Sequence, residues 1–324
     1  MKTMIRAFFV VMLAVFLIFI FFSLPTHRNI KGEDFLIKKG DTAFLVAKRL
    51  KRMQLIKSKW FFIGLVKLTG QSRKLQKGLY HFSGKDSTLE IFWKTVRGKI
   101  YTIHVTIPEG YSIWQIDELL SNKGITRQKK FLHFALKNNL YKKISYLPNS
   151  NLEGFLFPNT YAFPKNATVT NIALTMIKEF SNKIIRKYHN ELKNRNLYKV
   201  LKMASLIEKE AKLKAEQPII SQVFWRRLKI GMKLGCDPTV AYAVKKFKAE
   251  RILYRDLKFN SPFNTYLYKG LPPTPISNPG VSAFDAALHP AKSTYLYFVA
   301  KNDGSHYFSK TLREHNKAVE KYQR

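Results

Sequence analysis

Two glutamates in one short helical segment carry the clearest chemistry that this sequence offers. They are Glu208 and Glu210, within Lys202–Ala211. At about 100° per residue, Glu208 falls on the apolar side of the predicted helix. That side is set by Val200, Leu201, Ala204, Ile207 and Ala211. A carboxyl group facing an apolar surface loses hydration in its charged form, so its pKa rises and it can donate a proton near neutrality. From these residues alone, an exposed ion pair of Glu208 with Lys212 is the favoured interpretation, and a general acid is the alternative.

Glu210 and Asp237 are predicted to have structural roles. Glu210 points roughly 160° away from Glu208 around the helix, which favours a solvated or structural carboxylate. Asp237 precedes Pro238, a pair suited to the N-cap and first position of a helix. Neither acid is expected to serve the bond that Glu208 would protonate.

The histidines and the single cysteine do not form a pattern of metal ligands. His289, His306 and His315 lack the HExxH or short paired spacing of a metal site. We expect His289 and His315 to form hydrogen bonds within loops. A single cysteine, Cys236, excludes an internal disulfide. The sequence thus predicts no metal and no cofactor.

The elements that must position these residues indicate an α+β protein. Residues 35–38, 78–82 and 100–107 are predicted strands. Capping boxes at 87–90 and 112–115 open two helices, Asp41 or Thr42 caps another, and longer helices are expected over 169–187 and 199–213. Pro and Gly punctuate 152–164 and 270–280, a texture typical of cleft walls. The segment 35–82, in which KKGDT leads into an amphipathic helix, resembles a LysM-like module, a fold associated with N-acetylated glycans.

The N-terminal segment predicts a membrane anchor. Ala7–Leu24 contains one polar side chain, Ser23, and as a helix it would rise about 27 Å, close to the hydrocarbon thickness of a bilayer. A cleaved signal peptide usually has a shorter apolar stretch and a small-residue cleavage site, so an uncleaved anchor is preferred. Basic residues flank both ends and leave the orientation open: Lys2 and Arg6 on one side, Arg28, Lys31, Lys38 and Lys39 on the other.

The composition excludes disorder and sets the kind of partner. Hydrophobic residues make up 46% of the chain, which is enough to build cores. The 324 residues contain 57 Lys plus Arg against 21 Asp plus Glu, a formal net charge of +36. Such a surface attracts nucleic acid, anionic cell-wall polymers or lipid headgroups, depending on the side of the membrane it faces. Because no nucleic-acid-binding signature is present, we expect no nucleic acid.

Seven motifs occur in an order that resembles the endolytic murein transglycosylases of the YceG-like family. They are LEGFLFPNTY (152–161), ASLIEKEA (204–211), DPTVAY (237–242), SPFNTY (261–266), GLPPTPISNPG (270–280), HPAKSTYLYFVA (289–300) and GSHYFSKTLREHN (304–316). Two positions depart from the family pattern. Asn159 stands where aspartate is common, and Cys236 where a hydroxyl residue is more usual.

The resemblance implies cleavage of the MurNAc-β-1,4-GlcNAc bond of peptidoglycan without water, leaving 1,6-anhydro-MurNAc ends. It places the catalytic glutamate on Glu208. One carboxyl group suffices, since the sugar's own C6 hydroxyl attacks C1 and replaces the second carboxylate of ordinary glycosidases. Glu153, Asn264, Thr265 and Tyr266 are candidates for holding the glycan, with Tyr266 able to stack on a sugar face. A purely structural role is the open alternative for each.

The resemblance also implies an organisation and a location. We expect a cytoplasmic tip and anchor over 1–24, a linker and LysM-like module over 25–108, and a catalytic domain over 109–324. The protein would be single-pass in the inner (cytoplasmic) membrane, with its catalytic domain facing the periplasm or outside. It would act on peptidoglycan glycan strands in cell-wall assembly as a possible terminator of strand elongation, with peptidoglycan synthases as partners. The rival functions are a muramidase, a non-catalytic wall-binding scaffold and a membrane-tethered nucleic-acid binder.

Overall fold

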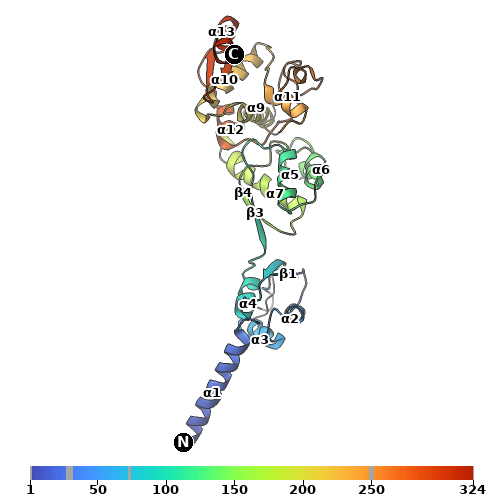
Figure 1. Cartoon of the computed structure of the whole chain (residues 1–324), viewed down its shortest axis with the longest axis vertical. Helices are drawn as coiled ribbons and strands as arrows, with labels where there is room; N and C mark the ends of the chain where they lie inside the picture. Colours follow the sequence, from blue (N-terminus) through green and yellow to red (C-terminus); the bar gives the residue numbers. More distant parts are fainter. Residues whose placement is uncertain (1, 27–31, 72–73, 248–251, 324) are drawn as a thin grey trace. The chain divides into compact units, whose positions relative to one another are not determined.

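The computed structural model describes residues 2–26, 32–71, 74–247 and 252–323 (Figure 1). Two compact units are present, Met1–Ile103 with Ala162–Asn166, and His104–Tyr161 with Ala167–Arg324. The predicted module and catalytic domain overlap the first and second unit, respectively. Helices dominate, and the strands pair in two-stranded sheets, so the predicted α+β class is confirmed.

Over its described residues, the first unit contains four complete helices and two complete strands. In chain order they are α1 (Lys2–Ser23), β1 (Glu33–Ile37), α2 (Ala43–Arg52), α3 (Lys59–Leu68), β2 (Gly78–Phe82) and α4 (Thr88–Val96). β1 pairs antiparallel with β2, with Phe35 opposite Tyr80. Alternate residues of both strands point into a core that α2, α3 and α4 cover. The LysM-like assignment of this βααβα arrangement stays a prediction.

Helix α1 is long and apolar enough to cross a membrane. Its spanning segment, Thr3–Ser23, has 21 residues, none of them buried within the protein. The last turn packs against the module, since the Phe61 ring lies 5.3 Å from that of Phe19 and 6.0 Å from that of Phe22. Arg28 and Lys31, two of the flanking charges considered for orientation, lie outside the described residues.

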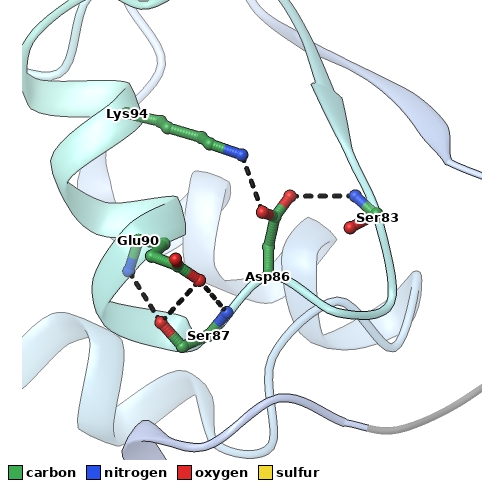
Figure 2. Close-up of polar contacts among 5 residues, drawn as sticks. All are labelled: Ser83, Asp86, Ser87, Glu90 and Lys94. Atoms are coloured by element: carbon green, nitrogen blue, oxygen red, sulfur yellow. Dashed lines mark hydrogen bonds and ion pairs between the residues drawn. The ribbon is translucent and has the colours of Figure 1, made fainter.

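Local capping explains where the helices of the first unit begin. Figure 2 shows the predicted capping box of α4, in which the backbone N–H of Ser87 donates to Glu90 at 2.7 Å. In return, the backbone N–H of Glu90 donates to the Ser87 hydroxyl at 3.1 Å. Asp86, the residue before this capping box, accepts a hydrogen bond from Lys94 Nζ at 2.7 Å. Thr42, one of two predicted caps, accepts from Leu45 N at the start of α2.

The second unit surrounds one central helix, α9. Its strands are β5 (Tyr297–Ala300) and β6 (His306–Ser309), while β3 (Thr102–Thr106) and β4 (Thr160–Pro164) each belong partly to the first unit and partly to the second. Its helices are α5 (Ile113–Asn122), α6 (Lys130–Leu136), α7 (Val169–Phe180), α8 (His189–Leu192), α9 (Leu197–Glu210), α10 (Gln217–Lys229), α11 (Asp237–Ala243), α12 (Val281–Leu288) and α13 (Leu312–Tyr322). Figure 1 shows α9 among α10, α11 and α12, and it contacts all three. The predicted capping box of α5, Ser112 with Gln115, is confirmed.

Two long helices end earlier than predicted. The helix expected over 169–187 is α7 up to Phe180 and then a π-turn, Ser181–Ile185, in which Arg186 N donates to Ser181 O. The helix expected over 199–213 is α9, which stops at Glu210 because Ala211 adopts an extended backbone, φ −86° and ψ 111°. Glu210 therefore lies at a helix end rather than inside a helix.

Candidate active site

The middle of helix α9 is buried all round, which corrects the one-sided helix predicted from the sequence. Five consecutive residues, Met203 to Ile207, are shielded from solvent. A stretch of that length covers every direction around a helix. The side of α9 that carries Glu210 therefore faces protein as well. Glu210 itself is partly exposed, and its assignment as a solvated or structural carboxylate stays a prediction.

Glu210 lies where α9 opens into a cavity of about 440 Å³. Burial, together with the nearby negative charge of Asp237, raises the pKa of Glu210 to about 8. The Cys236 thiol forms a hydrogen bond with this carboxyl group, and that bond lowers the pKa of Glu210. At pH 7 the group is therefore mostly protonated, as a general acid requires.

The cavity combines apolar walls with a positively charged rim. The apolar part includes Tyr242, Phe247 and Ile276. Besides Glu210 and Asp237, the charged part contains Lys209, Lys212, Lys301 and Lys246, which pairs with Asp256. A second hollow of about 520 Å³ shares Gln115 and Phe247 with it. The two hollows therefore have part of their walls in common.

Glu208, the predicted acid, lies on the other side of the last turn of α9. It is half-buried, and its Oε2 accepts a hydrogen bond from Gly280 N at 2.9 Å. Burial and the nearby carboxylate of Glu109 raise the pKa of Glu208, while Lys214 and Lys209 act against the shift. The raised pKa agrees in direction with the prediction. Glu208 is not among the residues that line the two cavities.

Glu109 is a neighbour of this site that sequence reasoning missed. It belongs to Pro108-Glu-Gly110, which the pattern identified only as a turn. Its Oε2 pairs with Lys214 Nζ at 3.2 Å, and a methyl group added to Gly280 would lie 1.9 Å from its Oε1. Gly110 has φ +76°, and a Cβ there would be 3.4 Å from Glu208 Cγ, so the turn packs directly on Glu208. The sequence signal that could have indicated this residue is an acid followed by glycine, Glu109-Gly110, directly after the predicted strand 100–107.

Glu153, a predicted glycan ligand, is a buried carboxyl group with its oxygens already engaged. Only 1% of the residue is exposed. It accepts from Ile113 N at 3.2 Å, the Tyr242 hydroxyl at 3.0 Å and Asn278 Nδ2 at 2.9 Å. Burial raises the pKa of Glu153 to about 8. Because Tyr242 lines the cavity, Glu153 supports the wall from behind.

The other three predicted ligands form a layer behind Asp237. Asn264 and Thr265 are buried, and Thr265 Oγ1 accepts from Cys236 N at 3.0 Å. The Tyr266 hydroxyl donates to Asp237 Oδ1 at 2.6 Å. Asp237 was expected as an N-cap, but Cys236 holds that position and Asp237 is the first residue of α11. Thus Tyr266 orients a carboxylate that lines the cavity.

The Pro-rich segment 270–280 is fixed to α9 by side-chain hydrogen bonds. Ser205 Oγ accepts from Ile276 N at 3.1 Å, and Ser277 Oγ donates to Ser205 O at 3.1 Å. Asn278 Oδ1 accepts from Leu156 N, and Asn278 Nδ2 donates to Glu153 and to Tyr111 O. The predicted cleft-wall segments 152–164 and 270–280 thereby meet at one buried asparagine.

Two of the three histidines lie within hydrogen-bond distance of carboxylates, whereas His315 lies in helix α13 and not in a loop as predicted. His306 Nδ1 lies 2.7 Å from Glu216 Oε2 at the edge of the cavity. His289 Nε2 lies 2.6 Å from Glu191 Oε2. Among the described residues, no group of three or more His, Cys, Asp or Glu side chains is arranged to hold a metal ion.

Comparison with known proteins places this geometry in a family. The YceG-like family matches residues 35–321, so the chain belongs to this family and the predicted resemblance is confirmed. An endolytic murein transglycosylase of Bacillus subtilis (strain 168) is 40% identical over 319 residues, covering 92% of this chain and 87% of the relative. An endolytic murein transglycosylase of Streptococcus pneumoniae (serotype 2, strain D39) is 25% identical, and this chain spans 59% of its length.

A solved structure is similar as well. The crystal structure of a YceG-like protein of Listeria monocytogenes matches with a TM-score of 0.56 at 33% sequence identity. The match covers 89% of this chain and 99% of that one.

Proposed function

We propose that this protein is an endolytic lytic transglycosylase, a lyase that cuts peptidoglycan glycan strands internally. The observation that carries the proposal is a carboxyl group with a pKa of about 8 at a 440 Å³ cavity, in a chain 40% identical to an endolytic murein transglycosylase. Membership of the YceG-like family over residues 35–321 supports the same function.

The proposed reaction uses one carboxyl group for two proton transfers. The protonated acid gives its proton to the glycosidic oxygen as the bond between C1 of MurNAc and that oxygen breaks. The C6 hydroxyl of the same MurNAc then forms a bond to C1, and its proton passes to the carboxylate. The acid is regenerated, no water is consumed, and the ring closure avoids the entropy cost of a second reactant.

Two carboxyl groups are candidates for this acid. The motif-based assignment is Glu208, which stays a prediction. The geometry favours Glu210, because Glu210 lines the cavity and has a pKa of about 8, whereas one oxygen of Glu208 is occupied by Gly280 N. We therefore propose Glu210 as the acid and Glu208 as the residue that holds the end of segment 270–280.

The walls of the cavity suit a polymer that carries carboxylates. Lysines on the rim would attract the acidic groups of a peptidoglycan strand, and Tyr242 and Phe247 offer ring faces to its sugars. Direct contact of Glu153, Asn264, Thr265 and Tyr266 with the glycan stays a prediction. Their hydrogen bonds favour a supporting role, in which Glu153 holds Tyr242 and Tyr266 holds Asp237.

The proposed location is the cytoplasmic membrane, with α1 as a single-pass anchor and the second unit outside. The apolar 21-residue span and the packing of its end against Phe61 support an anchor that is retained. Tethering would keep the enzyme near newly made strands, so a peptidoglycan synthase is a proposed partner and termination of strand elongation a proposed role. Absence of any crosslink to a synthase in intact membranes would contradict the partnership.

Product analysis tests the proposed function against its rivals. The full-length protein in detergent is incubated with purified peptidoglycan, and the new ends are identified by mass spectrometry. A lytic transglycosylase gives ring-closed ends, lighter by one water than the products of a muramidase. A non-catalytic scaffold gives no new ends. A reporter fusion that places the C-terminus in the cytoplasm would instead favour a membrane-tethered nucleic-acid-binding protein.

A further inference from the structure

A second cavity lies at the point where the apolar helix meets the first unit. This anchor-end hollow, of about 370 Å³, is lined by Phe21, Phe22 and Thr26 from the end of α1 and by Lys51, Ile56 and Lys57 from α2 and the segment after it. It is far along the chain from every residue of the candidate active site. Figure 1 shows α2 and α3 next to the upper end of α1.

The depth of the hollow in a bilayer follows from the helix that enters it. The spanning segment Thr3–Ser23 has 21 residues and rises about 30 Å, which uses the whole hydrocarbon thickness. Phe22 and Thr26 therefore lie at the level of the lipid headgroups. The junction is fixed by packing, since Thr88 Oγ1 donates to Phe22 O at 2.9 Å.

The charged groups of the hollow are the ammonium groups of Lys51 and Lys57, and the uncharged Gln54 also lines it. Lys57 Nζ donates to Phe21 O at 3.1 Å and lies 4.4 Å from the centre of the Phe21 ring, which holds the ammonium at the helix end. Lys51 is exposed at the same hollow. In the described part of the chain, neither lysine has an ion pair with a carboxylate.

A hydroxyl group completes the set. The Oγ1 atom of Thr26 is shielded from solvent and, within the residues that the structure describes, has no hydrogen-bond partner. Burying such a group is unfavourable unless a ligand satisfies it. Two ammonium groups and one free hydroxyl donor, grouped at headgroup depth beside aromatic rings, match a phosphate that is attached to an acyl-chain lipid.

We propose that the anchor-end hollow binds the phosphate of an anionic membrane phospholipid, with Lys51, Lys57 and Thr26 as its ligands. The acyl chains would lie along the exposed apolar surface of α1, which supplies continuity with the bilayer. A bound lipid would stabilise the junction between α1 and the first unit. The inference rests on α1 being the retained anchor of the proposed function.

The test is native mass spectrometry of the full-length protein released from detergent micelles that contain phosphatidylglycerol or phosphatidylcholine. We expect the wild type to retain one phosphatidylglycerol and the double variant Lys51→Gln/Lys57→Gln to lose at least five-fold of that retention. The control Lys48→Gln/Lys77→Gln changes the charge equally at exposed lysines elsewhere in the unit and should retain the lipid as the wild type does.

Further arms separate the possible outcomes. Thr26→Val conserves volume and removes only the hydroxyl, so a reduced retention with an unchanged melting temperature would tie the effect to the ligand set rather than to folding. Excess inorganic phosphate should not displace the lipid, and displacement would show a site for free phosphate. Equal retention by the two double variants, or of both lipids by the wild type, overturns the proposal. Activity on peptidoglycan fragments should stay unchanged in Lys51→Gln/Lys57→Gln, so failure of this site and failure of the proposed function are distinguishable.

Discussion

The two sides of the last turn of α9 contain glutamates in different surroundings. Glu210 lies at a cavity with Asp237 and Tyr242, and its pKa is raised to about 8. Glu208 is held by Gly280 N and lies near Glu109, which is exposed and paired with Lys214. The comparison teaches that a carboxyl group needs both desolvation and open space in front of it to deliver a proton to a substrate.

The largest expected effect is a difference in kcat between variants of Glu210 and Glu208. Glu210→Gln should reduce kcat by about 10³-fold or more, because the amide cannot donate and recover the proton. Glu208→Gln should reduce it by less than about 10-fold, because an amide oxygen can still accept the Gly280 N–H. Initial rates of ring-closed ends measure both. A reversed order would restore the motif-based assignment to Glu208.

A second effect concerns the stability of the wall behind the cavity. The pKa of Glu153 is raised from 4.5 to about 8, so the folded protein binds this proton more tightly than the unfolded chain does. The resulting contribution to the free energy of unfolding is fully present below pH 4.5 and is lost as the pH rises through 8. This contribution is on the order of 5 kcal/mol across that window. Glu153→Gln should flatten the fall in the free energy of unfolding between pH 5 and 8, measured by denaturant titration. An unchanged slope would contradict a buried carboxyl here.

The pH dependence of catalysis should follow Glu210 and respond to its neighbour. Activity, as kcat/KM, should fall as the pH rises through about 8, because the acid loses its proton. Asp237→Asn removes a negative charge that raises the pKa of Glu210, so the fall should move to lower pH. Tyr266→Phe keeps the charge of Asp237 but removes its hydrogen bond, so it separates the effect of the charge from that of the position of the carboxylate. A profile unaffected by Asp237→Asn would argue against this coupling.

The smallest effect tests the side that carries Glu208. Gly280→Ala places a methyl group 1.9 Å from Glu109 Oε1, and the exposed Glu109 side chain can swing away. We expect a loss of activity of about 2- to 5-fold and a destabilisation below about 1 kcal/mol. Gly64→Ala, where no atom lies within 4 Å of the added methyl, should leave activity unchanged. A loss above 10² in Gly280→Ala would show that Glu208 and Glu109 participate in the chemistry.

The elements of the first unit could be predicted because its helices follow one-sided patterns. Capping signals at Thr42 and Ser87 and the alternation around Phe35 depend on residues close in sequence, and these predictions are confirmed. The order of motifs was enough to predict the family, because it requires no knowledge of the packing.

The surroundings of the two glutamates could not be predicted in the same way. A helical wheel assumes one dry side and one wet side, but α9 contacts α10, α11 and α12. Burial of Glu210 depends on α11, and the approach of Glu109 to Glu208 depends on a turn about 100 residues earlier in the sequence. Such long-range contacts leave no periodic signal.

Titration of the Glu210 carboxyl group tests the central claim most directly. The protein is labelled with ¹³C at glutamate side chains, and the Glu210 resonance is assigned by its absence in Glu210→Gln. We predict a single transition with its midpoint near pH 8. A midpoint near 4.5, the value of a free glutamate, would contradict Glu210 as the proton donor.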